Sequence, residues 1–369
     1  MVTVLAGVAA LMPVVVIVIV IVFMFVSHYK RLYYFYKPLP RPNAKMYVMK
    51  TTAGNIEDSL RSVNAYVATE LGTIDRDVFN FEKYPFSFMG KAVRARFTLL
   101  TASALGAGAD RAEKAAAAAE LTHTASLLHD DCLDMARYRR GLPTLYDQLG
   151  VNSAILVGDL LIALAFECAR RAAPDLQESL VQAVKRMTEG ALIEENSRGK
   201  KITAAAAEKI VALKTGALFR WCSLAACRLA GKPELLADCA RLGEEAGSAF
   251  QVIDDVLDFE GDAGACGKET LKDIKEGTYT LPLILALNDA QAGPAAEKLL
   301  AAVKAGPEAD LAPALDLADL VRKGGFSGTA RRTAAEKLRN LFPVIDKFPD
   351  AEGAAALKDF LLALGERTA

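Results

Sequence analysis

The sequence predicts an all-α protein in which one large helical domain, residues 51–369, follows an apolar N-terminal segment. Three observations predict this fold class. Beyond residue 51 the chain is dominated by long stretches of Ala, Leu, Glu, Lys and Arg, such as Arg111–Tyr138, which favour helices. Glycine and proline separate these stretches, and no low-complexity linker divides the domain. The chain also lacks runs of alternating β-branched residues bounded by turns, the pattern typical of strands.

The first 27 residues are predicted to form one transmembrane helix that precedes the domain. Residues 1–27 contain no charged side chain, and Val4–Val26 alone spans 23 residues. A helix rises about 1.5 Å per residue, so this length crosses a bilayer core of about 30 Å. A cleaved secretory signal is the alternative. However, no basic segment begins the chain, and no small-x-small cleavage site precedes His28.

Residues 28–50 are predicted to be a basic and aromatic juxtamembrane linker. Lysine and arginine occur six times in the first fifty residues, all after residue 27, and no acidic residue occurs there. Tyrosines and Phe35 surround the first basic residues, as is typical of a membrane–water interface. Because the positive charge lies only on the C-terminal side, we expect a single-pass membrane protein whose domain faces the cytoplasm.

The composition excludes several other protein classes. A hydrophobic content of 52% with 24% charged residues excludes a disordered chain. The net charge of −1, from 44 basic and 45 acidic residues, gives no basis for nucleic-acid binding. The six cysteines show no CxxC spacing, which excludes a zinc ribbon and favours reduced thiols over a disulfide scaffold.

Two aspartate clusters are the candidate functional residues. Leu127–Asp134 and Phe250–Asp258 each contain the pattern DDxxD late in an apolar helical stretch. The spacing places the first and last carboxylates of each cluster on one helical face. Such like charges repel, and oxygen-only ligands favour Mg²⁺ bridging carboxylates to substrate phosphates. A single DDxxD is equally consistent with a solvated helix end, but two copies 124 residues apart favour the metal site.

Five ordered motifs resemble those of the trans-isoprenyl (polyprenyl) diphosphate synthases, from about residue 51 to the C-terminus. The aspartate clusters resemble the family's two aspartate-rich motifs, the first with its trailing Arg139-Arg140-Gly141. Gly90-Lys91-x-x-Arg94 resembles an upstream motif, and Gly158-Asp159 and Lys214-Thr215-Gly216 lie where the family places two more. The resemblance implies an isoprenoid-synthase-like bundle of antiparallel helices around a central cavity, with the clusters facing each other across its mouth. It also implies a homodimer.

The resemblance further implies the reaction and the residues that perform it. An allylic diphosphate loses pyrophosphate, isopentenyl diphosphate attacks the resulting cation, and a proton is lost. The implied ligands of about three Mg²⁺ ions per substrate-bound site are Asp130, Asp131, Asp134, Asp254, Asp255 and Asp258. Arg139, Lys214 and Lys268 would bind the allylic diphosphate, and Thr215 and Gln251 would direct oxygens toward the cation. Lys91, Arg94, His123 and Arg140 would bind isopentenyl diphosphate.

Several positions depart from the family pattern. Met89 replaces a glycine before Lys91, and Ala95 replaces a proline. The usual Gly-Glu-x-x-Gln element appears as Gly190-Ala-Leu-Ile-Glu194. Thr278 stands where a lysine is expected, which removes one cation from the implied allylic diphosphate site. This last change affects the expected substrate affinity or rate, and leaves the metal ligands in place.

Small residues before the first cluster predict a long product. Ala118, Thr122 and Ser126 follow one another at four-residue steps, with Ala125 beside them, so one face stays small for about three turns. Family members that make short products tend to carry an aromatic residue four or five positions before the first aspartate. Here those positions are Ser126 and Ala125, as in long-chain members. The alternative is that small residues only allow close helix packing.

Together these features predict a membrane-anchored, Mg²⁺-dependent, long-chain trans-polyprenyl diphosphate synthase. Such a prenyltransferase acts on isopentenyl and allylic diphosphates. A geranylgeranyl-size synthase is the alternative within the same chemistry. A non-catalytic regulatory partner subunit of another synthase is a second alternative, although both aspartate clusters are intact. A class I terpene cyclase usually lacks a second true DDxxD and the pair Lys91 and Arg94.

Overall fold

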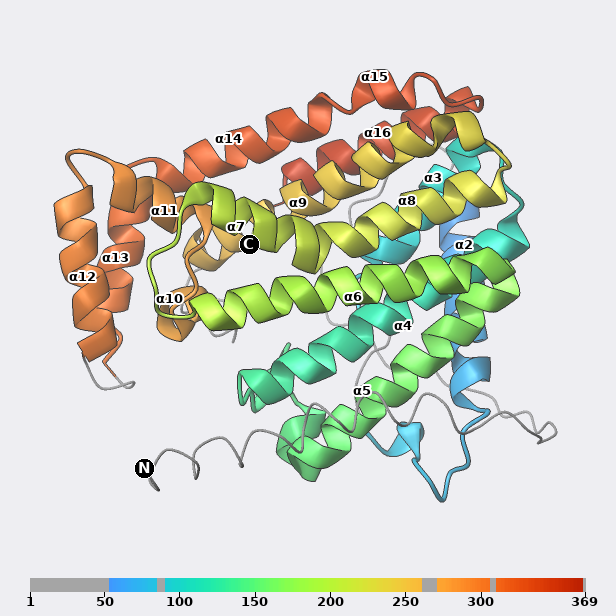
Figure 1. Ribbon diagram of the computed structural model, residues 1–369, viewed down its shortest axis with the longest axis horizontal. Helices are drawn as coiled ribbons and strands as arrows, with labels where there is room; N and C mark the ends of the chain where they lie inside the picture. The colour runs from blue at the N-terminus through green and yellow to red at the C-terminus, as the bar shows by residue number, and fades with distance from the viewer. Residues whose placement is uncertain (1–52, 85–89, 261–270, 306–309, 368–369) are drawn as a thin grey trace, which may run out of the picture.

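Helices make up most of the described chain, in agreement with the predicted fold class. The computed structural model describes residues 53–84, 90–260, 271–305 and 310–367 (Figure 1). The predicted membrane anchor and juxtamembrane linker, Met89 and Lys268 lie outside these residues. The helices in chain order are α2 (Ala53–Leu71), α3 (Val93–Leu105), α4 (Ala109–Leu133), α5 (Leu145–Ala172), α6 (Pro174–Ser197), α7 (Ala204–Val211), α8 (Ala217–Leu229), α9 (Leu236–Glu260), α10 (Lys272–Glu276), α11 (Leu281–Asn288), α12 (Gly293–Ala305), α13 (Ala312–Lys323), α14 (Phe326–Arg339), α15 (Phe342–Ile345) and α16 (Ala351–Gly365). Shorter turns are η2 (Phe81–Lys83), the π-helical η3 (Ala212–Gly216) and η4 (Pro233–Leu235).

Helix α4 lies inside the bundle because its side chains are small. Every residue from Ala115 to Ala119 is fully buried. Helix α4 packs against α2, α3, α5 and α8. Small side chains let neighbouring helices approach on several sides at once, so one alanine-rich helix accommodates four partners. Figure 1 shows α4 and α5 in the lower part of the view, with α9, α14 and α16 along the top.

A second, smaller hydrophobic core lies among α11, α12 and α13, which Figure 1 shows at the left end of the bundle. Leu283 of α11 and Leu317 of α13 are buried in it together with Phe259. Phe259 belongs to the last turn of α9 and directly follows Asp258 of the second aspartate cluster. Burial of this ring therefore fixes the end of α9 that carries the second cluster.

The chain segment after the first aspartate cluster differs from the sequence prediction. The pattern predicted a helical stretch from Arg111 to Tyr138, but α4 ends at Leu133. The chain then forms a small antiparallel hairpin of β1 (Tyr138–Arg139) and β2 (Leu142–Pro143). Strands of two residues are too short to show an alternating pattern, so no periodicity in the sequence indicates them.

Two of the described helical stretches are long and apolar enough to cross a membrane by length and composition, namely Leu145–Ala172 and Ala204–Leu229. Core helices of a bundle have the same composition, and both stretches pack against other helices here. Helix α5 nevertheless leaves apolar side chains at the surface, with Val151 43% and Leu156 51% exposed. Helix α5 is therefore only partly covered by the rest of the described chain.

Candidate active site

Most of the predicted site residues line one cavity with a volume of about 1060 Å³. Its walls come from the N-terminus of α3, the C-terminal parts of α4, α6 and α9, the π-helical η3 and the segment around α10. The predicted residues that line it are Lys91, Arg94, His123, Ser126, Asp130, Asp134, Arg139, Arg140, Lys214, Thr215, Gln251, Asp254, Asp255 and Asp258. Motifs more than a hundred residues apart therefore meet in one place.

In the first aspartate cluster each carboxylate has a cationic partner from another part of the chain. The pairs are Asp130 with Lys214 (Oδ1 to Nζ, 3.8 Å), Asp131 with Arg139 (Oδ1 to Nε, 2.8 Å) and Asp134 with Arg198 (Oδ1 to Nη2, 3.1 Å). Asp131 is buried beneath its arginine and does not itself line the cavity. Three cations from three elements therefore converge on the end of α4 and offset its negative charge.

In the second cluster a cation and two N–H groups are among the partners of the carboxylates. The contacts are Arg367 Nη1 to Asp254 Oδ1 (2.7 Å), Gln251 Nε2 to Asp255 Oδ1 (2.8 Å) and the backbone N–H of Asp273 to Asp258 Oδ2 (3.2 Å). Burial, together with the nearby charges of Asp254, Glu194 and Asp258, raises the pKa of Asp255 to about 7. Burial and Asp258 also raise the pKa of Asp273 well above its ordinary value. Asp255 and Asp273 are therefore buried carboxylates whose like-charged neighbours disfavour their ionised forms.

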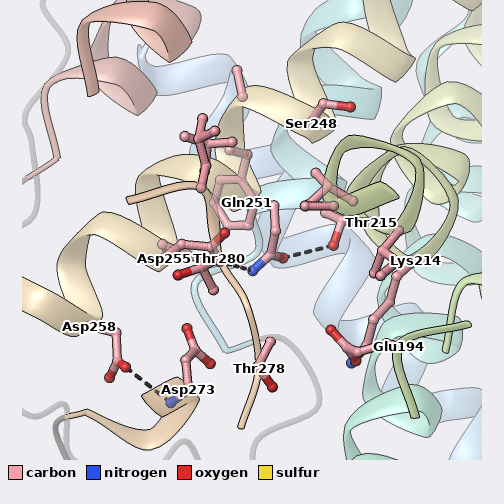
Figure 2. Close-up of a pocket in the computed structure, with 18 of the residues that line it drawn as sticks. Glu194, Lys214, Thr215, Ser248, Gln251, Asp255, Asp258, Asp273, Thr278 and Thr280 are labelled. Carbon is pink, nitrogen blue, oxygen red and sulfur yellow. Dashed lines mark hydrogen bonds and ion pairs between the residues drawn. The ribbon is translucent and has the colours of Figure 1, made fainter. Parts of the chain in front are cut away.

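The π-helical η3 lies between α7 and α8 and directs Thr215 toward the second cluster. A π-helical turn is rare and is frequently found at functional sites. Thr215 Oγ1 donates a hydrogen bond to Gln251 Oε1 (2.7 Å), while Gln251 Nε2 donates to Asp255 (Figure 2). This chain of hydrogen bonds fixes the orientation of the Gln251 amide, with its oxygen toward η3 and its nitrogen toward α9.

Close packing of α6 against η3 positions Lys214. A Cβ atom added to Gly190 would lie only 2.6 Å from the backbone nitrogen of Lys214, so a larger residue would displace η3. One turn further along α6, Glu194 Oε2 lies 2.5 Å from Lys214 Nζ. Burial lowers the pKa of this lysine, but Asp130 and Glu194 outweigh that effect and raise it. Lys214 is therefore cationic where it faces the cavity.

Glu120 holds the N-terminus of α3, which the sequence analysis did not predict. Its Oε1 accepts a hydrogen bond from the backbone N–H of Ala95 (2.8 Å), and the side chain is buried. Ala92, the residue that begins α3, has a left-handed φ of 50° and provides no side-chain cap. A carboxylate from α4 therefore satisfies an otherwise free amide of α3 and fixes the turn that carries Lys91 and Arg94.

Arg94 and His123 lie together at the α3 end of the cavity. The Arg94 guanidinium lies 5.3 Å from the ring centre of Phe219 and 5.9 Å from that of Phe250, a cation–π arrangement. Its Nε atom has no hydrogen-bond partner among the described residues. Burial, with Arg94 and Arg140 nearby, lowers the pKa of His123 well below its ordinary value. His123 is therefore neutral at pH 7 and offers hydrogen bonds, and not charge, to a ligand.

The hairpin after α4 presents two arginines in different directions. Arg140 and Gly141 form its turn with φ values of 53° and 75°, as a two-residue turn of type I′ requires. Arg139 contacts Asp131 of the first cluster. The Arg140 guanidinium packs against Gly90, where an added Cβ would lie 2.4 Å from Nη1. The hairpin therefore connects the first cluster with the loop that precedes Lys91.

The structure corrects part of the predicted tunnel wall on α4. Ser126 lines the cavity one turn before Asp130, as predicted. Ala118, Thr122 and Ala125 do not line it, because they are buried in the hydrophobic interior. At these three positions the small side chains allow α4 to pack closely against its neighbours, which was the alternative interpretation of the pattern. Ser126 remains the predicted position for control of product length.

Many residues that line the cavity were not predicted as site residues, and four charged ones among them are Glu120, Arg198, Asp273 and Arg367. Glu120 lies three residues before His123 on the same helix, so helical periodicity alone could have identified it. The other three carry no local pattern, because their positions depend on contacts between distant segments. Arg331 Nη1 of α14, for example, donates to the carbonyl oxygen of Arg367 (2.6 Å) and so directs the end of the chain into the cavity.

The carboxylates fit a divalent cation by the type of donor. Within the described ranges, no group of three His, Cys, Asp or Glu side chains is already arranged to hold a metal ion. The donors are nevertheless oxygens only, as Mg²⁺ prefers, and they approach the cavity from both α4 and α9. The raised pKa values of Asp255 and Asp273 reflect burial and repulsion that a bound cation would relieve. The residues present therefore suit Mg²⁺.

Comparison with known proteins identifies the family. The family model described as polyprenyl synthetase matches residues 78–316, a range that contains both aspartate clusters and η3. The chain belongs to the polyprenyl synthetase family. The resemblance inferred from the motifs is thereby confirmed, as is the expectation that the protein is an enzyme of the trans-polyprenyl diphosphate synthase type.

Relatives within the family differ in the product their names give. The chain is 30% identical to a nonaprenyl diphosphate synthase of Mycobacterium tuberculosis, over 84% of this chain and 94% of that protein. It is 35% identical to a geranylgeranyl diphosphate synthase of the same organism, over 71% of this chain and 75% of that protein. Among solved structures, a polyprenyl synthase from Caulobacter crescentus, complexed with calcium and isoprenyl diphosphate, has a TM-score of 0.78 and 28% identity. That similarity covers 86% of this chain and 97% of the other.

Proposed function

We propose that this protein is a membrane-anchored, Mg²⁺-dependent trans-polyprenyl diphosphate synthase that makes a long-chain product. The observation that supports this most strongly is the convergence of the α4 and α9 aspartate clusters on one cavity, with Lys214 and Arg139 beside them. Negative ligands for metal ions and fixed cations are what an allylic diphosphate needs before it ionises. The related Caulobacter structure holds calcium and isoprenyl diphosphate, which supports the same ligand chemistry for this cavity.

Each part of the cavity has a role in the proposed reaction. Mg²⁺ held by the carboxylates would supply positive charge to the leaving diphosphate. Lys214 and Arg139 lie beside the first cluster and would bind the same diphosphate. Thr215 and the Gln251 amide oxygen, held by their mutual hydrogen bond, would face the carbon that becomes cationic. These neutral oxygens stabilise a cation without capturing it as a free carboxylate would.

The α3 end of the cavity would bind isopentenyl diphosphate. Arg94 lies on the first turn of α3, Lys91 lies in the turn just before that helix, and Arg140 approaches from the hairpin. Arginine suits bidentate contacts with phosphate oxygens, and the aromatic rings that flank Arg94 keep its guanidinium in place. With the two diphosphates bound at opposite ends of the cavity, the double bond of one substrate faces the reacting carbon of the other.

A geranylgeranyl-size product is the second candidate, and one observation favours it. The cavity contacts α4 at Ser126 but not at Ala125, Thr122 or Ala118, so its α4 wall does not continue down that face. The names of the relatives include both product classes. We favour the long-chain product because Ser126 leaves the wall open one turn below the first cluster.

The test of this proposal is direct. The purified protein is incubated with labelled isopentenyl diphosphate, with Mg²⁺ and with geranyl, farnesyl or geranylgeranyl diphosphate in turn, and the products are sized by chromatography. Products longer than C20 that disappear on chelation of the metal support the proposal. C20 products alone would select the geranylgeranyl-size alternative. A folded protein that incorporates no label with any primer would refute the proposed activity.

We also propose that the protein forms a homodimer through α5 and α6. Exposed apolar side chains gather on these two consecutive helices, namely Val151, Leu156, Val181 and Leu192. Leu192 is 58% exposed, and apolar groups of this size are usually covered in an assembly. Replacing Leu156 with Glu should shift the mass measured by light scattering from dimer to monomer. An unchanged mass would place the interface elsewhere.

A further inference from the structure

Arg198 lies in the cavity although no motif includes it. It directly follows α6, and its guanidinium contacts three carboxylates. These contacts are to Glu195 (Nε to Oε2, 2.9 Å), Asp134 (Nη2 to Oδ1, 3.1 Å) and Glu276 (Nη1 to Oε2, 3.8 Å). The side chain is 29% exposed, so part of the guanidinium faces the open cavity. Arg198 therefore places a permanent positive charge next to the last aspartate of the first cluster.

The backbone beside Arg198 is tied to the segment that contains Thr278. The N–H of Gly199 donates to the carbonyl oxygen of Gly277 (3.0 Å), and Lys304 Nζ donates to the carbonyl oxygen of Gly199 (2.7 Å). Gly277 is the residue immediately before Thr278, and Thr278 is among the side chains that line the cavity (Figure 2). The hydrogen bond between Gly199 and Gly277 therefore holds the segments of Arg198 and Thr278 together at the cavity mouth.

This part of the mouth is rich in carboxylates and has an uncharged residue at position 278. Asp134, Glu194, Asp273 and Glu276 all line it, and Lys214 is paired with Glu194. A diphosphate that enters here needs a cation that stays in place beside Asp134. The guanidinium presents five N–H donors in a rigid fork, so it can hold a carboxylate and a phosphate oxygen at the same time.

We propose that Arg198 binds the allylic diphosphate and supplies the positive charge that Thr278 does not. This inference rests on the proposed function and deepens it. In this arrangement Arg198 keeps its contact with Asp134 and directs its remaining N–H groups toward the leaving diphosphate. The charge on this side of the mouth comes from the end of α6, and the segment after α10 contributes a neutral hydroxyl group.

Kinetics of Arg198→Gln test the proposal, because glutamine keeps some hydrogen bonding but removes the charge. We expect the KM for farnesyl diphosphate to rise about 10- to 100-fold, as for the loss of a charged hydrogen bond, with the KM for isopentenyl diphosphate unchanged. Adding Thr278→Lys to this variant should recover most of the loss, since a cation then returns to the same part of the mouth. Lys201→Gln is the matched control, because Lys201 lies on the same loop, pairs with Glu297 and is not among the cavity-lining residues.

A binding measurement separates this inference from the proposed function. Calorimetric titration with inorganic pyrophosphate and Mg²⁺ needs no turnover, and Arg198→Gln should weaken the affinity about tenfold or more while Lys201→Gln leaves it unchanged. A lower melting temperature with unchanged KM and pyrophosphate affinity would assign Arg198 a structural role and overturn the inference. Equal increases in both KM values, or no recovery with Thr278→Lys, would also overturn it. A wild-type protein that makes no product would instead refute the proposed function.

Discussion

The two aspartate clusters share one spacing but differ in how the fold balances their charge. In the first, at the end of α4, Lys214, Arg139 and Arg198 each contact one carboxylate. In the second, at the end of α9, Arg367 contacts Asp254. Burial, together with the nearby charges of Asp254, Glu194 and Asp258, raises the pKa of Asp255 to about 7. The two motifs therefore supply the same three carboxylates at the same spacing. The elements that pack around each motif determine which groups pair with those carboxylates.

The clusters also differ one turn before their first aspartates. Ser126 stands at that position on α4, and Phe250 stands there on α9. Phe250 is 7% exposed, and its ring contacts the guanidinium groups of Arg94 and Arg367. The α9 side of the cavity is therefore closed by an aromatic ring where the α4 side is open. We expect both clusters to hold the metal and the diphosphate, and the wall below the first cluster to let the growing product pass.

The largest expected effect comes from removing one carboxylate of either cluster. Asp130→Ala or Asp254→Ala should lower kcat by about a thousandfold or more, because stabilisation of the leaving diphosphate is lost. Steady-state incorporation of labelled isopentenyl diphosphate measures the effect, and circular dichroism checks that the fold remains. Near-normal turnover in either variant would contradict the idea that both clusters serve one site.

A second prediction concerns the free energy of unfolding, which a substitution of Asp by Asn should change in opposite directions in the two clusters. At pH 8, Asp255→Asn should stabilise the metal-free protein by about 1 to 3 kcal/mol, because it removes a buried charge. Asp131→Asn should destabilise it by about 1 to 2 kcal/mol, because the buried ion pair with Arg139 is lost. Denaturant unfolding measures both changes. If both substitutions changed the free energy of unfolding in the same direction, the proposed difference between the clusters would be contradicted.

The effect of Asp255→Asn on stability should also depend on pH. The pKa of Asp255 is raised from 3.8 to about 7 in the folded protein, so the folded state binds a proton that the unfolded state has released. The native protein therefore loses stability as pH rises from about 4 to about 7, and Asp255→Asn removes that part of the loss. Below pH 3.8 the group is protonated in both states, so the stabilisation by Asp255→Asn should vanish there.

A third prediction concerns a substitution that places an aromatic ring one turn before the first cluster, as Phe250 stands one turn before the second. Ser126→Phe places a ring in the cavity one turn below Asp130, and a close-packed interior does not move aside easily. The products should shorten to C15–C20, with the first condensations at similar rates, as measured by product sizing. Ala125→Phe is the control, because Ala125 is fully buried and a larger side chain there should lower the melting temperature. Unchanged product length with Ser126→Phe would remove Ser126 from the product path.

The smallest effect is expected from the N-terminal segment, because both clusters lie in the domain that follows it. Removal of residues 1–45 should release a soluble protein whose kcat stays within about twofold of the full-length value, since the predicted anchor serves attachment to the membrane. Detergent-free fractionation and the incorporation assay measure these two outcomes. In sealed right-side-out vesicles the full-length protein should resist external protease, and digestion of the domain would reverse the predicted orientation.

Local patterns in the sequence predicted the helices and the residues of the cavity well. The apolar stretches that end in DDxxD predicted the C-terminal parts of α4 and α9, because helical period and carboxylate repulsion are properties of a short segment. The motif set also predicted that Lys91, Lys214 and Gln251 share one site, and the structure brings them together.

The features that the sequence did not predict depend mostly on contacts between segments that are far apart in the chain. Arg198 and Arg367 reach the cavity only because α6 ends near Gly277 and α14 holds the end of the chain. The alanines of α4 have the same side chains whether they line a tunnel or pack against a helix, so the sequence did not show that Ala125 lies outside the described cavity. The hairpin after α4 was not predicted, because strands of two residues are too short to show an alternating pattern in the sequence.

The most direct test of the central claim is calorimetric titration of Mg²⁺ and inorganic pyrophosphate into the wild-type protein, Asp130→Ala, Asp254→Ala and the double variant. If both clusters hold one metal–diphosphate group, each single substitution should weaken binding at least about tenfold, and the double variant should bind little worse than either single one. Wild-type affinity in either single variant, or losses that simply add, would mean that the two clusters act separately and would contradict a shared site.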